Sequence, residues 1–346
     1  MDSLTQIVLG GAVAASIAPA KHRRAALLAG AALGTLPDLD VLPVNLLLAD
    51  PIDRMSWHRG PSHSLFVLPF VAWAIWAFCK RRSGRVAEAP VRWGWAILLA
   101  LITHPLLDAF TVYGTQLLWP LAAPPVMWSS VFIIDPLYTV WLLAACIIAW
   151  CWPTGVRAQY ALVAGLALSS AYLGWSLAAK QMIEQRAAEG LAAIGHADAP
   201  RVSVPMPLNT LLWQVVAITP DGYLEGEYSL PADRGAMRFR HYPSDREALL
   251  AVQDFAAVRR ISWFNHGFQR ARQMEDKLVL TDLRMGSEPD YFFNFAVAYQ
   301  DANGQWQPLL PAEQIPLPRE RVNMQQLHRL WQRIWQAQPA ESFYAH

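Results

Sequence analysis

Hydrophobic residues are distributed unevenly along the 346-residue chain. Up to about Ala179 long apolar runs alternate with short polar connections, and beyond it apolar and polar positions are mixed as in a soluble domain. The apolar runs cover residues 7–18, 25–36, 65–79, 93–110, 131–152 and 158–179. Because a helix needs about 20 apolar residues to cross a bilayer, these runs predict a membrane all-α bundle of about six helices. The first run is the shortest and the least typical of a span.

The same pattern divides the chain into three segments. Residues 1–180 are expected to form the membrane-embedded helical domain. Residues 181–208 begin with an amphipathic helical pattern and continue into a proline-rich stretch, which predicts a helical stalk and linker. Residues 209–346 have the length and mixed polarity of one soluble α+β domain.

Local signals predict the elements of the soluble domain. The expected strands cover 211–219, 223–230, 277–285 and 291–299, and the expected helices cover 244–261 and 322–336. Asp221-Gly222 between the first two strands is typical of a hairpin turn. Ser244 followed by Glu247 resembles a capping box, so we expect Ser244 to cap the first of these helices.

Charge predicts the orientation of the helices. The connections after the first, third and fifth runs hold Lys21, Arg23, Arg24, Lys80, Arg81, Arg82, Arg85, Arg92 and Arg157. The alternate connections hold only Arg54 and Arg59. Since basic residues favour the cytoplasmic side, the connection 37–64 is expected at the outer face of a bacterial inner membrane, and the soluble domain in the periplasm.

Composition agrees with a membrane protein and excludes some other classes. The hydrophobic fraction is 54%, charged residues make up 16%, and there are 16 tryptophans. A net charge of +1 gives no reason to expect a nucleic-acid partner. The three cysteines lie in or beside apolar runs and predict neither a disulfide framework nor a cysteine-rich metal site.

Ionisable residues interrupt the apolar half at a few places. The connection 37–64 contains two acids and two histidines, and His104 and Asp108, four residues apart, share one face of a predicted helix. Such groups are expensive near lipid, so their collection at one level of the membrane indicates a functional site. Imidazole and carboxylate are ligands of divalent metals, zinc foremost. The predicted metal ligands are Asp38, Asp40, His58, His63, His104 and Asp108.

Other residues near the cluster have ordinary alternatives. Arg59 is expected to bind an anionic substrate group and Asp40 to take part in catalysis, yet Arg59 could simply extend towards lipid headgroups. Asp135, followed by Pro136, is better interpreted as a helix N-cap than as a ligand. Each histidine alone is more often a hydrogen-bonded residue than a ligand, so the prediction depends on several connections converging.

Six short segments, taken in order, resemble one known family. They are Met1-Asp2-Ser3-Leu4-Thr5-Gln6, Pro37-Asp38-Leu39-Asp40, His58-Arg59-Gly60-Pro61-Ser62-His63-Ser64, His104-Pro105-Leu106-Leu107-Asp108, Tyr113-Gly114-Thr115 and Trp119-Pro120. The pattern resembles the bacterial inner-membrane metal-dependent hydrolase family typified by YdjM, over about residues 1–180. The resemblance implies a membrane hydrolase that uses a metal. The family is itself distantly similar to zinc-dependent phospholipase C and P1 nucleases.

One departure from the family pattern affects the ligand set. Many members carry a histidine after the small or hydroxyl residue near the start, where this chain has Thr5-Gln6. Glutamine is a poor substitute for imidazole as a zinc ligand, so we expect either one ligand fewer or a glutamine that binds substrate or water.

Three functions are consistent with these patterns. The leading one is a metal-dependent hydrolase that acts on a phosphoester of a lipid or lipid-linked substrate. A non-catalytic membrane scaffold or binding protein with a structural histidine–aspartate cluster is the alternative, and the partner of its soluble domain is unknown. A transporter is disfavoured, because a translocation path should place ionisable residues at mid-membrane.

Overall fold

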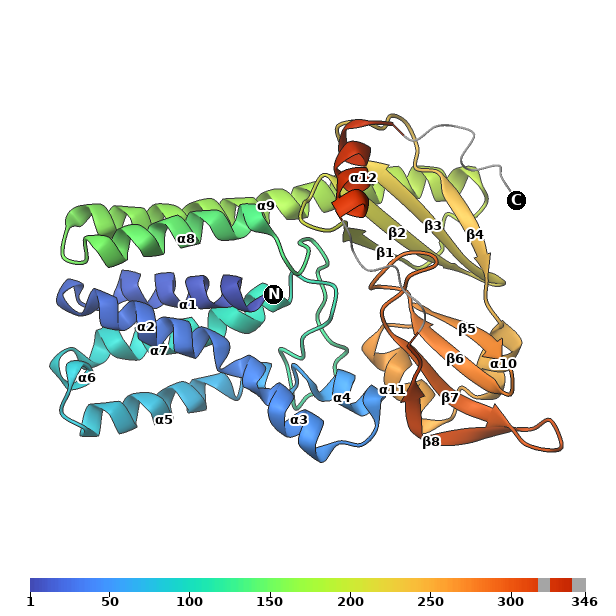
Figure 1. Cartoon of the computed structure of the whole chain (residues 1–346), viewed down its shortest axis with the longest axis horizontal. Coiled ribbons are helices and arrows are strands. Elements are labelled where there is room, and N and C mark those ends of the chain that lie inside the picture. Colours follow the sequence, from blue (N-terminus) through green and yellow to red (C-terminus); the bar gives the residue numbers. More distant parts are fainter. Residues whose placement is uncertain (317–323, 338–346) are drawn as a thin grey trace. The chain divides into compact units, whose positions relative to one another are not determined.

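The computed structural model describes residues 1–316 and 324–337, which form two compact units. The first unit consists of Met1–Leu46 and Trp57–Ser176, and the second of Leu47–Ser56 and Leu177–His346. Figure 1 shows helices in the part of the chain coloured blue to green and strands in the part coloured yellow to red.

The division between the units differs from the expected limits at 180 and 208. It falls between Ser176 and Leu177, inside the single helix α9 (Val156–Ala193), which runs without a break from the apolar sequence into the amphipathic sequence. The segment Leu47–Ser56 also belongs to the second unit, although its neighbours on both sides belong to the first. Within the second unit, Asp50 Oδ2 accepts a hydrogen bond from the backbone N–H of Ala312, at 2.9 Å.

The first unit is built of helices. The longer ones are α1 (Ser3–Ile17), α2 (Arg23–Thr35), α5 (Leu68–Arg81), α7 (Pro90–Asp108), α8 (Pro136–Cys151) and the first part of α9. The short ones are η1 (Ala20–His22), η2 (Pro37–Asp40), α3 (Val41–Leu47), η3 (Pro61–His63) and α6 (Arg85–Glu88). A further short helix, α4 (Pro51–Trp57), lies almost entirely in the segment Leu47–Ser56 that belongs to the second unit. Each of the six apolar runs lies at least in part within one of the longer helices.

Among the residues that the structure describes, three stretches are long and apolar enough to cross a membrane. They are Ala20–Leu47, Pro90–Asp108 and Val156–Ala193. A fourth becomes possible if Pro51–His63 and Leu68–Arg81, which meet at 55°, act as one broken span. Helices α1 and α8 are shorter. The prediction is therefore confirmed as a helical N-terminal half with about three candidate spans, whereas the six-helix membrane bundle stays a prediction.

Glycines let α1 and α2 pack closely, as the small-residue composition of their sequences favours (Figure 1). A Cβ atom built on Gly30 would lie 2.2 Å from the carbonyl oxygen of Gly10, and one built on Gly34 would lie 2.4 Å from that of Gln6. Ala12, Ala15 and Ala26 nearby are fully buried. Only residues without a Cβ allow the two backbones this approach.

The second unit contains two four-stranded antiparallel sheets, with strand orders β1-β2-β3-β4 and β5-β6-β7-β8. The first sheet contains β1 (Arg201–Pro205), β2 (Leu212–Thr219), β3 (Gly222–Ser229) and β4 (Phe239–Pro243). The second contains β5 (Gln269–Met274), β6 (Lys277–Asp282), β7 (Asn294–Gln300) and β8 (Trp306–Gln314). The predicted hairpin is confirmed, because Thr219 pairs with Gly222 across the turn. The sequence did not predict β1, β4, β5 or β8.

The prediction of a single helix at 244–261 is wrong. The structure has α10 (Arg246–Ala251) and α11 (Ala256–Phe264) instead. The N-cap is Asp245, whose side chain accepts from the N–H of Ala248, because the Ser244 hydroxyl accepts from the N–H of Ala271 in β5. The last predicted helix corresponds to α12 (Met324–Trp335), and residues 322–323 of the expected range lie outside the described residues.

A buried polar network links the two sheets. The Tyr223 hydroxyl on β3 and the Arg270 guanidinium on β5 both bind the carboxylate of Glu288. The Tyr291 hydroxyl donates to Glu225 Oε2 at 2.6 Å, and burial raises the pKa of Glu225. Because buried carboxylates need such partners, the network fixes one arrangement of the sheets.

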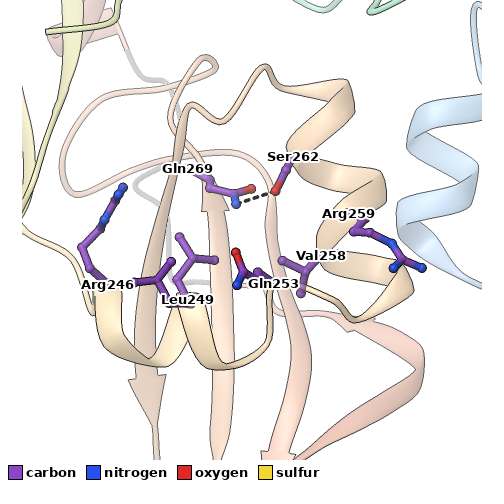
Figure 2. Close-up of a pocket in the computed structure, with 8 residues that line it drawn as sticks. Arg246, Leu249, Gln253, Val258, Arg259, Ser262 and Gln269 are labelled. Atoms are coloured by element: carbon purple, nitrogen blue, oxygen red, sulfur yellow. Dashed lines mark hydrogen bonds between the residues drawn. The ribbon is translucent and has the colours of Figure 1, made fainter. Parts of the chain in front are cut away.

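A pocket of about 370 Å³ lies beside α10 and α11, with Gln269 of β5 donating to the Ser262 hydroxyl at 2.8 Å (Figure 2). Its lining consists of Arg246, Leu249, Leu250, Gln253, Val258, Arg259, Ser262 and Gln269. Since this lining includes no histidine, cysteine or acid, the pocket is not a second candidate metal centre.

The close approach of α1 and α2 gives a testable consequence. Gly30→Ala is expected to destabilise the protein by about 1–3 kcal/mol, because the new methyl group overlaps the Gly10 carbonyl and the backbones must separate. Thermal unfolding of the detergent-solubilised full chain measures the change. The matched control is Gly174→Ala in α9, where a Cβ meets nothing within 4 Å. Equal melting shifts in both variants would contradict this account of the packing.

Candidate metal centre

Three elements bring four ionisable side chains together. Asp38 lies in η2, the turn that follows α2, and His63 lies in η3, which precedes α5. His104 and Asp108 lie one turn apart near the end of α7. His63, His104 and Asp108 have completely buried side chains, and that of Asp38 is 28% exposed. The centre is therefore closed on the helix side and reachable at Asp38.

The four side chains point single atoms at one another. The Nε2 atoms of His63 and His104 are 3.1 Å apart. Each Nε2 lies 3.3 Å from Asp38 Oδ1, and the distances to Asp108 Oδ2 are 3.4 and 3.5 Å. One ligand atom from each of the four residues lies within 4.8 Å of all the others.

Hydrogen bonds on the far side of each ring fix where its proton lies. His104 Nδ1 is 2.5 Å from the carbonyl oxygen of Gly34, which can only accept, so Nδ1 carries the proton. His63 Nδ1 is 2.9 Å from the Ser62 hydroxyl, which donates to Asp40 Oδ2 at 2.5 Å, so this Nδ1 also donates. In the neutral rings both Nε2 atoms therefore present lone pairs to the centre.

The facing carboxylate oxygens are also without hydrogen bonds. Asp38 Oδ1 and Asp108 Oδ2 are buried and make none within the described part of the chain. With both imidazoles neutral, four lone pairs converge on a point partly shielded from water, an arrangement that costs several kcal/mol unless a proton or a cation lies between them. Two imidazole nitrogens and two carboxylate oxygens suit a divalent metal, with zinc as a good match.

The separations restrict the coordination geometry. With metal–ligand bonds of about 2.0–2.2 Å, a tetrahedral ion holds its ligands about 3.3–3.6 Å apart. An octahedral ion with bonds of that length holds neighbouring ligands about 3 Å apart. The five separations of 3.1–3.5 Å fit a tetrahedral set, or an octahedral set in which the two carboxylates lie opposite each other. The second arrangement leaves two adjacent positions free.

Two predicted ligands lie outside this group. Asp40 Oδ1 is 2.7 Å from His58 Nδ1, so the two residues pair with each other. Asp40 Oδ2 also accepts from the backbone N–H of Arg59, at 3.0 Å, and from Ser62. Asp40 thus supports His63 through Ser62, as carboxylates behind metal-bound histidines commonly do. The structure gives His58 no contact with the four-residue centre beyond an edge-on ring approach to His63, with centroids 6.1 Å apart.

Arg59 lies against the centre rather than facing solvent. It is buried, its Nε atom is 3.1 Å from Asp108 Oδ2, and its guanidinium carbon lies 4.9 Å from the centre of the Tyr113 ring. Its backbone has φ = 63°, a conformation that costs a non-glycine residue on the order of 1–3 kcal/mol. The first effect of Arg59 is therefore to neutralise Asp108, and its predicted contact with substrate stays a prediction.

Gln6 contacts the centre through its side-chain amide nitrogen. Its amide nitrogen donates to Asp108 Oδ1 at 2.9 Å, and the amino group of Met1 contacts the same oxygen. These bonds leave Asp108 Oδ2 facing the histidines. Asp135 lies elsewhere and caps α8, accepting from the N–H groups of Leu137 and Tyr138, as expected.

Two supporting groups were missed by the sequence reading. Ser62 is adjacent to His63, and its hydroxyl could have been suspected from that position alone. The part played by the Gly34 carbonyl could not have been suspected, because every residue has a backbone carbonyl and the sequence does not show which of them faces a histidine.

The helical unit that contains the centre matches a known protein family. The profile of the family described as YdjM inner membrane protein matches residues 1–183. The chain belongs to the YdjM inner membrane protein family. The match covers all four residues of the centre and ends before the sheets of the second unit. Together with the candidate spans, the YdjM family name indicates an inner-membrane protein.

The comparisons do not extend beyond the YdjM family. No curated protein and no solved structure matches the chain. The expected distant similarity to zinc-dependent phospholipase C and P1 nucleases therefore stays an expectation, and the YdjM match itself names no reaction.

The geometry predicts that His63 and His104 are metal ligands and that His58 is not. His63→Ala and Asp108→Ala should each reduce bound metal from about one ion per chain towards none, because each removes one of four converging ligands. His58→Ala is the matched control and should keep its metal, since His58 pairs with Asp40 instead. Elemental analysis of the detergent-purified variants measures the metal. Full retention in both ligand variants would exclude this centre.

The support of His63 by Asp40 predicts an intermediate effect. Asp40→Asn should weaken metal binding about 10–100-fold without abolishing it, because it weakens the acceptor that orients Ser62 and hence His63. Competition with a chromogenic chelator measures the affinity. Asp198→Asn, an exposed acid in the second unit, is the control. An unchanged affinity in Asp40→Asn would show that the Ser62 hydroxyl needs no such support.

Proposed function

We propose that the protein is a membrane-bound, divalent-metal-dependent hydrolase that acts on a phosphoester of a lipid or lipid-linked substrate at the outer leaflet. The observation that supports it best is the group Asp38, His63, His104 and Asp108, whose four ligand atoms lie within 4.8 Å of one another. A divalent cation held there would activate water and polarise a phosphoryl oxygen.

The protein's own groups would prepare this chemistry. The Gly34 carbonyl and the Ser62 hydroxyl hold the two imidazoles in the tautomer that binds a metal. Arg59 and Gln6 contact Asp108 and keep this buried carboxylate ionised and oriented. Because these partners are already in place, little reorganisation is needed when a cation binds.

The surroundings of Asp38 support a lipid substrate. Asp38 is the only partly exposed member of the four-residue centre. The residues that follow it in η2 and α3 expose large apolar side chains, with Leu39 at 51%, Leu42 at 60% and Leu46 at 84%. A substrate that remains in the bilayer would meet these leucines on its way to the centre. The choice of the outer leaflet rests on the distribution of lysine and arginine.

A structural metal centre is the second candidate, and a specific observation favours it. Four protein ligands at tetrahedral separations saturate a zinc ion, whereas catalytic zinc normally keeps one position for water. In that case the protein would be a membrane scaffold whose helices α2, α5 and α7 are held together by the ion.

Coordination and turnover together separate the two candidates. The hydrolase should release phosphate or a phosphorylated headgroup from vesicles that contain lipid phosphoesters, lose the activity to a chelator, and regain it with zinc. Asp38→Asn should slow turnover at least about 100-fold, because it removes a ligand at the reachable side. Asp198→Asn should keep the full rate. Cobalt-substituted protein with a closed tetrahedral spectrum that does not respond to phosphate, and without turnover, would favour the scaffold.

A further inference from the structure

A second polar feature of the first unit lies at the other end of α5, away from the metal centre. Lys80, Arg81, Arg82 and Arg85 follow one another at the turn between α5 and α6, and all are exposed. Among the residues that the structure describes, none of these four forms an ion pair. The only acid in the sequence between residues 65 and 103 is Glu88, and it is held by Lys21 and His22. The turn therefore carries four positive charges close together that no acidic side chain in the described part of the chain neutralises.

An apolar groove opens next to these cations. Its volume is about 240 Å³, and its lining consists of Trp76, Pro90, Val91, Gly94, Trp95 and Leu98, from α5 and α7. These helices lie side by side and are joined through α6 (Figure 1). The Trp76 indole N–H donates to the Pro90 carbonyl at 2.8 Å, which holds this wall in place. Gly94 faces Trp76 without a side chain of its own, and this keeps the groove open.

The cations and the groove are physically joined. Lys80 Nζ lies 4.8 Å from the centre of the Trp76 ring, so one of the cations lies on the wall of the groove. The Arg82 guanidinium lies 4.9 Å from the Phe78 ring. Membrane topology alone accounts for basic residues at a cytoplasmic turn. It does not account for a hollow between α5 and α7 that is lined by two tryptophans next to these residues.

We infer that this groove binds one anionic phospholipid, with its phosphate on Lys80, Arg81, Arg82 and Arg85 and part of an acyl chain between Trp76 and Leu98. The charge of the turn complements a phosphate, and the aromatic and aliphatic lining complements a hydrocarbon chain. Basic pockets between membrane helices are suited to such headgroups. The inference does not depend on the proposed hydrolase activity, because it uses none of the residues of the metal centre.

Lipid titration of the detergent-purified full chain, followed by native mass spectrometry, tests the inference. Phosphatidylglycerol should bind with a defined stoichiometry and more tightly than phosphatidylcholine. The triple variant Arg81→Ala, Arg82→Ala, Arg85→Ala should bind phosphatidylglycerol on the order of a hundredfold more weakly, since each basic residue contributes about fivefold. Arg157→Ala, at an exposed arginine in the first turn of α9, is the control and should bind as the unchanged protein does.

A second variant keeps the charges and fills the groove. In Gly94→Leu the new side chain extends past Trp76, where a Cβ is tolerated at 3.4 Å, and occupies the space assigned to the acyl chain. It should weaken binding of long-chain phosphatidylglycerol but leave that of a dihexanoyl analogue unchanged. This variant remains informative if the triple variant fails to insert.

Three results would overturn the inference. One is equal affinity for phosphatidylglycerol and phosphatidylcholine. Another is unchanged affinity in both the triple variant and Gly94→Leu. The third is displacement of the lipid by an equal concentration of inorganic phosphate, which would show that the cations bind a free anion and that the groove has no part in it.

Discussion

The convergence of four potential ligand atoms in a largely buried place is the constraint on which the helical unit depends. Neutral His63 and His104 with ionised Asp38 and Asp108 would repel one another at 3.1–3.5 Å if nothing positive lay between them. Arg59 offsets part of the charge from one side. The remainder is offset by a proton on an imidazole or by a bound cation, since buried charges are stable only when they are paired or coordinate a metal.

The same residues determine how the helices pack and how the centre is built. Gly34 has no side chain, so α2 comes within contact of the Gln6 backbone on α1. The same residue turns its carbonyl oxygen to His104 on α7, and Gln6 donates to Asp108 on that helix. Small residues that favour close helix contact therefore also set the orientation of two ligands. A larger residue at position 34 would disturb the fold and the centre together.

The sequence was informative about the centre because its ligands interrupt apolar runs. Asp38, His63, His104 and Asp108 stand out by type and position, and the structure brings these four together. Asp40 and His58 have the same residue types in the same connection, and nothing in a sequence shows which oxygen or nitrogen faces the centre. Their pairing depends on the turn at Arg59, whose left-handed backbone no pattern predicted.

The soluble unit shows a related limit. Strands with a hairpin signal, such as β2 and β3, were predicted nearly to the residue. Strand β5 (Gln269–Met274) was not, because its sequence, Gln-Arg-Ala-Arg-Gln-Met, is polar and becomes a strand only through pairing with β6. Ser244 was predicted as a helix cap and instead bonds to that same strand. Tertiary pairing overrode local preference at both places.

The difference in burial among the four ligands restricts how the centre could work. Three side chains are completely enclosed, and Asp38 alone is partly exposed. It also lies in a short 3-10 turn, whereas His104 and Asp108 are fixed on a long helix. If a position on the ion has to open for a substrate, Asp38 is the ligand that can yield it with the least disturbance of packing. A substrate of the proposed hydrolase would therefore reach the centre past Asp38 and the exposed leucines that follow it, which is the side on which a lipid would arrive.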